Sequence, residues 1–123
     1  MNFIIIVVLC CVLYVTFIMR SNVDKDFVIN TIVRGCARWA SASLQDKSPL
    51  VAVLHANYAA GYLWALRDVF PDKDIQQYAH IDPIQFQKRI TDVQDQATKL
   101  MIKVCPQYRS HIDDYLGAIA GEY

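Results

Sequence analysis

The stretch His55–Asp72, HANYAAGYLWALRDVFPD, decides the fold that this sequence predicts. Before its final aspartate, the charged side chains are Arg67 and Asp68, and apolar residues occupy most faces when the stretch is wound into a helix. A helix that is apolar all round is covered by neighbours on most sides. We therefore expect this stretch to belong to the central helix of a small bundle rather than to an active site.

Strong boundary signals enclose this central helix. Ser48 is a favoured N-cap residue and Pro49 suits the first helical turn, so the helix is expected to begin there. Pro71 ends it after Phe70, because proline lacks a backbone donor and restricts the residue before it. A second membrane span from Pro49 to Leu66 is the alternative, but the asparagine, histidine and tyrosines there suit lipid poorly.

Small residues recur along one face of this helix. Ala52, Ala56 and Ala60 are spaced by four residues, and Gly61 lies beside them. Such a stripe lets a second helix approach closely. A glycine inside a helix costs up to about 1 kcal/mol relative to alanine, so close packing is a reason to keep it. We predict that all four are helix-packing residues.

The N-terminal segment Phe3–Met19, FIIIVVLCCVLYVTFIM, carries no charge. At about 1.5 Å per residue it reaches roughly 25 Å, near the lower limit for crossing a bilayer core. We predict a transmembrane anchor over residues 1–20. The anchor residues are Phe3, Ile4, Ile5, Ile6, Val7, Val8, Leu9, Val12, Leu13, Phe17 and Ile18.

Two other interpretations of this segment stay open, a cleaved signal peptide and a buried core helix. A signal peptide is disfavoured because no basic residue precedes the apolar run and no small-x-small cleavage site follows it directly. For an anchor, the basic residues Arg20, Lys25, Arg34 and Arg38 all follow the span. The positive-inside rule then predicts that the C-terminal domain lies on the cytoplasmic side.

The remaining chain predicts an all-α domain. Residues 21–26 are polar and are expected to form a juxtamembrane hinge, with Asp24 or Asp26 capping the next helix, and residues 27–123 form the helical domain. Asp72 and Asp82 are expected to cap two further helices, and Ser110 or Asp113 a last short one. No segment alternates with period two, so we expect a bundle of about four helices. The helix from Pro83 to Val104 has an apolar seam made of Phe86, Ile90, Val93, Ala97, Leu100 and Val104.

The charges and motifs give little support to catalysis or to nucleic-acid binding. The 12 basic and 12 acidic residues balance, and no basic stripe with interleaved aromatics is present. No zinc-protease, serine-hydrolase or phosphate-loop motif occurs. Helical neighbours of His55 include neither a metal ligand nor a carboxylate, so we expect it to be hydrogen-bonded within or at the edge of the bundle. We predict no catalytic residue, no cofactor and no metal site. We expect Cys36 and Cys105 to be free thiols, although a disulfide stays open.

The strings HANYAAGYLWALRDVFPDKDI (55–75), QDQATKLMIKVCP (94–106) and AGEY (120–123) give the chain a resemblance to a family. It resembles the small single-pass membrane or virion proteins of large DNA viruses of algae and protists. The resemblance covers Lys47–Tyr123. It implies an anchor with a compact helical domain in a viral internal or host-derived membrane, and a link between that membrane and a capsid shell.

Two functions follow from these expectations. The first is a membrane-anchored structural protein whose partners are the lipid bilayer and other proteins, which are capsid proteins, envelope proteins or copies of itself. The alternative is a membrane-tethered helical module that binds a small apolar ligand or a cofactor in a cavity lined by His55 and tyrosines. A membrane-tethered enzyme ranks last, because the sequence shows no residues to carry its chemistry.

Overall fold

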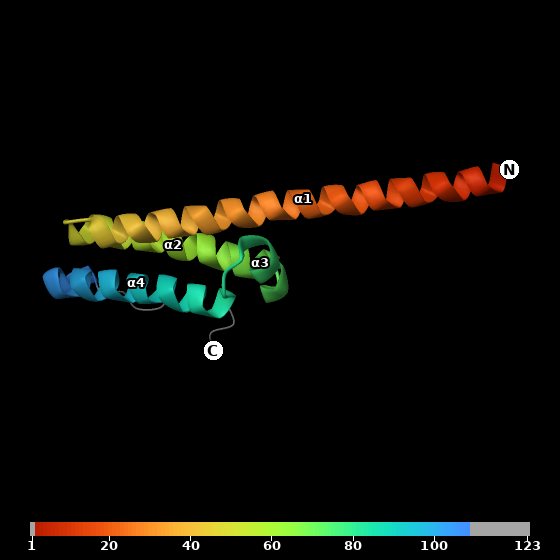
Figure 1. Cartoon of the computed structure of the whole chain (residues 1–123). Helices are drawn as coiled ribbons and strands as arrows, with labels where there is room; N and C mark the ends of the chain where they lie inside the picture. Colours follow the sequence, from red (N-terminus) through yellow and green to blue (C-terminus); the bar gives the residue numbers. More distant parts are fainter. Residues whose placement is uncertain (1, 109–123) are drawn as a thin grey trace, which may run out of the picture.

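The fold is all-α, as predicted. The computed structural model describes residues 2–108, and the predicted last helix beginning at Ser110 or Asp113 lies outside them. The helices are α1 (Asn2–Gln45), α2 (Pro49–Val69), α3 (Asp72–Ala79) and α4 (Pro83–Val104), followed by a 3-10 turn, Pro106–Tyr108. Figure 1 shows α2 between α1 and α4, while the N-terminal half of α1 extends beyond the bundle.

The hinge predicted at residues 21–26 is wrong, because α1 is helical through them. This segment holds neither glycine nor proline, so nothing in its backbone chemistry interrupts a helix. Asp26 therefore lies inside α1 and caps no helix. Its carboxylate accepts a hydrogen bond of 2.8 Å from Nδ2 of Asn30, which also donates to the carbonyl of Tyr78 at 3.0 Å. The first domain helix and the apolar segment thus form one helix.

The apolar N-terminal half of α1 packs against nothing in the part of the chain that the structure describes. All side chains from Phe3 to Met19 are exposed, with Phe3 77% and Phe17 75% accessible. No described residue covers this segment as a buried core helix would be covered. Among the described residues, α1 is the one helix that is long and apolar enough to cross a membrane.

Most of the predicted helix boundaries are confirmed. α2 begins at Pro49, although the side chain of Ser48 makes no capping hydrogen bond, and the helix ends at Val69 before Pro71. α4 begins at Pro83, and the Asp82 carboxylate accepts from the backbone N–H groups of Ile84 and Gln85 at 2.9 and 3.1 Å. One cap differs, because Pro71 takes the N-cap position of α3 and Asp72 lies in its first turn.

The core lies along α2. Ala52, Ala56 and Ala60 are at most 4% exposed, which confirms them as packing residues, and Ala59 is fully buried beside them. A main cluster joins Ala52, Ala56 and Ala59 to residues of α1 and α4. Phe86 packs against this cluster and against a second one made of Ile29, Leu66 and Ile75. α2 is therefore the central helix that its composition predicted.

Two side chains of α1 donate hydrogen bonds directly to the backbone of α2. The Cys36 thiol donates to the carbonyl of Ala59 at 3.1 Å, and the Ser43 hydroxyl donates to the carbonyl of Ala52 at 2.8 Å. Each contact lies seven residues from the other on both helices, in opposite directions, so α1 and α2 form an antiparallel pair in a fixed register. Contacts of this kind require that the helix backbones approach closely, which the alanines allow.

The packing role predicted for Gly61 is wrong. Gly61 is exposed, and a Cβ atom added there would meet no atom of residues 2–108 within 4 Å. The glycine that does receive a neighbour is Gly35 on α1, where an added Cβ would lie 3.1 Å from Cε1 of Tyr62. Ala60 and Gly61 are consecutive residues of α2 and therefore point in different directions. Ala60 belongs to the buried face of the helix, and Gly61 does not.

The apolar seam of α4 is confirmed in its first three turns and corrected in its last ones. Ile90, Val93 and Ala97 are buried, but Leu100 is 48% and Val104 58% exposed, and Met101 is buried in their place. A step of four from Ala97 keeps the seam on the face that meets α2, since a straight helix has 3.6 residues per turn.

The two glycines are expected to respond oppositely to substitution. Gly61→Ala should stabilise the domain by about 0.5–1 kcal/mol, because alanine favours the helix and its methyl group meets nothing. Gly35→Leu should destabilise it by about 1–3 kcal/mol, because the new side chain must displace the ring of Tyr62. Urea unfolding of the detergent-solubilised chain, followed by circular dichroism, measures both. A loss of stability in Gly61→Ala would contradict the placement of Gly61 in open space.

Candidate functional site: an apolar groove beside α2

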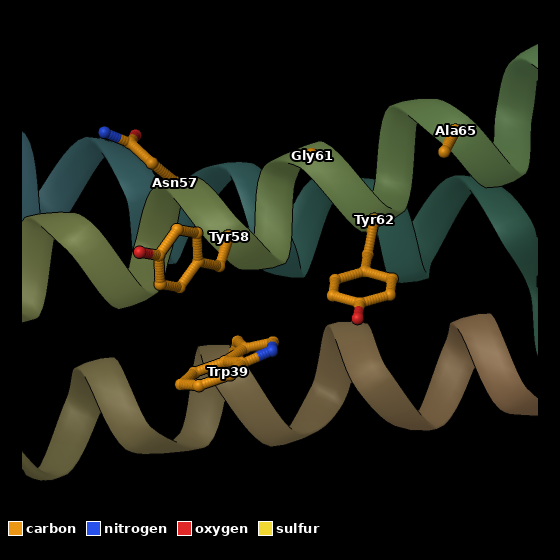
Figure 2. Close-up of a pocket in the computed structure, with 6 residues that line it drawn as sticks. All are labelled: Trp39, Asn57, Tyr58, Gly61, Tyr62 and Ala65. Atoms are coloured by element: carbon orange, nitrogen blue, oxygen red, sulfur yellow. The ribbon is translucent and has the colours of Figure 1, made fainter.

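An open groove runs along α2 on the side where Gly61 lies. Its volume is roughly 510 Å³. The lining residues are Trp39 from α1 and Asn57, Tyr58, Gly61, Tyr62 and Ala65 from α2. Figure 2 shows Trp39 and the two tyrosine rings between the helices, with Gly61 and Ala65 along the ribbon of α2. The groove therefore has an aromatic wall and a wall of small residues.

The α1–α2 register builds the aromatic wall. The ring centroids of Trp39 and Tyr58 are 5.2 Å apart with an interplanar angle of 68°, an edge-to-face arrangement. One turn away, the ring of Tyr62 lies against Gly35, which has no side chain to push it out. Tyr58 is 52% and Tyr62 42% exposed, so each ring packs on one side and presents the other to the outside.

The groove is electrically neutral. No charged residue is among its lining residues, and its one amide, Asn57, is engaged because its Oδ1 accepts from Nε2 of Gln94 on α4 at 2.9 Å. Leu54, one turn before Tyr58 on α2, extends the exposed apolar surface and is 46% exposed. A contiguous apolar surface on a small protein is typical of a site that another molecule covers.

His55 lies beside this groove and is not among its lining residues. Its Nδ1 is 2.6 Å from a carboxylate oxygen of Asp46, and both side chains are about one quarter exposed. Its ring centroid is 5.0 Å from that of Trp39. The expectation of a hydrogen-bonded histidine at the edge of the bundle is thus confirmed, and the contacts tie the α1–α2 connection to the aromatic wall.

The partner of His55 was missed at the level of sequence. Within one helix a side chain meets residues three and four positions away, and none of those is acidic. Asp46 belongs instead to the connection that precedes α2, nine residues earlier. The only sequence signal was an aspartate close to the turn that folds α2 back on α1, because that turn brings residues from both sides together.

All four cysteines are free thiols, so Cys36 and Cys105 do not form a disulfide. Cys36 is fully buried, and this burial raises the pKa of its thiol to about 12. The thiol is therefore protonated near neutral pH, consistent with its role as a hydrogen-bond donor to Ala59. Cys10 and Cys11 lie in the exposed apolar half of α1.

Within residues 2–108, no group of three or more His, Cys, Asp or Glu side chains is arranged to hold a metal ion. In comparisons with protein families, curated proteins and solved structures, the chain has no significant match. The groove and the exposed half of α1 are therefore the features that bear on its function.

Burial should protect Cys36 from alkylation. At pH 8 we expect Cys36 to react with iodoacetamide roughly 100-fold or more slowly than Cys105, which is half-buried, because the thiolate is the reacting species. Peptide mass spectrometry after timed alkylation of the folded chain measures both rates. In strong denaturant the two rates should converge. Equal rates in the folded state would contradict the burial of Cys36 between α1 and α2.

Proposed function

We propose that this chain is a membrane-anchored structural protein whose helical domain docks a protein partner outside the bilayer. The observation that carries the proposal is the continuity of α1, which joins an exposed apolar segment to the packed domain without a break. One rigid helix of this kind sets the height and direction of the domain relative to the membrane. The apolar groove beside α2 then has a fixed position above the bilayer.

The exposed half of α1 needs an apolar environment that shields its side chains from water. Burying a large aliphatic side chain is worth roughly 1.5–3 kcal/mol, and the segment from Phe3 to Met19 exposes such side chains on every face. A lipid bilayer covers all faces of one helix at once. The first charged residue after the segment is Arg20, which suits the headgroup layer. The excess of basic residues that follows favours a cytoplasmic domain.

The groove suits a second copy of this chain. In the register set by the Cys36–Ala59 and Ser43–Ala52 contacts, Gly61 lies level with the middle of the packed part of α1, roughly 21 Å beyond Arg20 at about 1.5 Å per residue. Because α1 is continuous, copies in one bilayer hold their grooves at the same height and in the same orientation. The formal net charge is zero, so no long-range repulsion separates the copies. Two copies can approach each other closely at Gly61, since this residue has no side chain.

The setting implied by the family resemblance is a virion. The part of α1 beyond residue 20 is roughly 38 Å long at about 1.5 Å per residue, so the α1–α2 connection lies far from the bilayer surface. A protein of this shape can link a membrane to a protein shell, with α1 in the lipid and the distal end of the bundle at the shell. Capsid or envelope proteins are the partners that this setting provides.

The alternative function is a module that binds a small apolar ligand. The groove volume of roughly 510 Å³ falls within the range of small-molecule sites, and Tyr58 and Tyr62 line it as that hypothesis expected. His55 points elsewhere, to Asp46. The groove is open to solvent, which suits a helix better than a small molecule, because a bound small molecule is usually enclosed over most of its surface.

A charge placed at Gly61 tests the docking role without disturbing the fold. Gly61→Glu should not lower the unfolding temperature of the chain, because the new side chain meets no described atom and glutamate favours a helix more than glycine does. It should weaken self-association in vesicles more than tenfold, since burying an unpaired carboxylate costs several kcal/mol and each 1.4 kcal/mol is a factor of ten. Single-molecule photobleaching of labelled full-length chain in liposomes measures the dimer fraction.

The matched control is Gln96→Glu, which adds the same charge on an exposed position of α4. It should leave the dimer fraction unchanged. Crosslinking of native membranes through Lys47, Lys73 and Lys99, with isotope-mixed copies, identifies the partner. Links between copies that disappear in Gly61→Glu support the proposal. Links to a different protein that disappear in Gly61→Glu, or links confined to one copy, would overturn the assignment of a second copy. An extractable small molecule would favour the alternative.

A further inference from the structure

A second cavity lies where the bundle meets the apolar half of α1. Its volume is roughly 500 Å³. The residues that line it are Phe17, Arg20, Asp24, Lys25 and Val28 from α1 and Phe70 from the end of α2. In Figure 1, the end of α2 and the adjoining α3 lie alongside α1 where the bundle begins. This cavity is separate from the groove at Gly61 and shares no residue with it.

Three charged residues line this cavity, Arg20, Asp24 and Lys25. Lys25 is engaged, because its Nζ lies 3.2 Å from a carboxylate oxygen of Asp74, whose side chain is 12% exposed. Arg20 and Asp24 take part in none of the ion pairs among the described residues. They are one helical turn apart, which places them about 6 Å from each other along the axis of α1.

The order of these residues along α1 matches the layers of a membrane surface. Phe17 belongs to the apolar segment, Arg20 is the first charge after it, and Asp24 lies one turn further from the bilayer. Arginine at this depth binds phosphate groups through its planar guanidinium. A carboxylate farther out, beside an aromatic ring, suits an ammonium group. The exposed ring of Phe17 and the half-buried ring of Phe70 border the same space.

We propose that this cavity binds the headgroup of a zwitterionic phospholipid, with the phosphate at Arg20 and the ammonium group at Asp24. The proposal rests on the membrane span proposed for α1. An anionic lipid is disfavoured because Asp24 repels additional negative charge, while Lys25 is already neutralised by Asp74. The acyl chains continue along Phe17 into the bilayer. The lipid thereby covers the apolar surface between Phe17, in the membrane-spanning part of α1, and Phe70.

The test uses the full chain in nanodiscs that contain equal amounts of phosphatidylethanolamine and phosphatidylglycerol. Native mass spectrometry counts the lipids that stay bound after the disc is removed. The wild-type chain should retain phosphatidylethanolamine in preference to phosphatidylglycerol. Arg20→Gln should lower the retention of phosphatidylethanolamine by about fivefold, the factor that corresponds to the ~1 kcal/mol contributed by a basic side chain at a membrane surface. Asp24→Asn should shift the preference toward phosphatidylglycerol.

Arg34→Gln is the matched control, because Arg34 is an exposed arginine on the same helix roughly 21 Å further along, at about 1.5 Å per residue. It should retain lipid as the wild type does. Preference of the wild type for phosphatidylglycerol, or equal behaviour of Arg20→Gln and Arg34→Gln, would overturn the headgroup site while leaving the span intact. Failure of the chain to enter nanodiscs at all would instead refute the span, and the headgroup site with it.

Discussion

The close approach of α1 and α2 is the constraint on which the rest of the structure depends. Cys36 and Ser43 reach the carbonyls of Ala59 and Ala52 because α2 presents methyl groups at those positions. A larger side chain at either alanine would separate the helices and remove both hydrogen bonds, leaving buried donors unsatisfied. The same register sets Trp39 against Tyr58. Packing, interhelical hydrogen bonds and the aromatic wall of the groove therefore follow from a single alignment.

The continuity of α1 connects the end of the bundle directly to the exposed apolar segment. Beyond the apolar segment, α3 is held to α1 by two polar contacts, the Lys25–Asp74 ion pair and the hydrogen bond from Asn30 to the carbonyl of Tyr78. Hydrophobic packing of Ile29 with Leu66 and Ile75 lies next to them. The bundle thus begins within one or two turns of the polar segment at residues 21–26. A helix fixed at its base in this way transmits its direction to the domain.

Local sequence patterns predicted where most helices begin and end. The groove and the side-chain pairs depend instead on contacts between residues that are distant in the sequence. Pro49, Pro71 and the Asp82–Pro83 pair marked helix ends correctly, because proline acts through its own backbone. Polar residues at 21–26 predicted a hinge that is absent, since polarity alone does not break a helix. The groove could not be predicted from periodicity, because its walls depend on where α1 lies against α2. The same is true of the Asp46–His55 pair and of the ring of Tyr62 on Gly35.

The faces of α2 have different surroundings, and these explain its composition. Two faces meet α1 and α4 in the described part of the chain, and they account for the buried alanines and leucines. The remaining face combines two features that lower stability, exposed apolar side chains and a helical glycine that costs about 0.5–1 kcal/mol relative to alanine. Within residues 2–108 nothing fills the space at Gly61, and the rings of Tyr58 and Tyr62 are still 52% and 42% exposed although each packs on one side. Sequences that break local rules usually do so where function requires it. Because both costs fall on one face and the groove runs along it, their compensation is best sought in a molecule that covers this face.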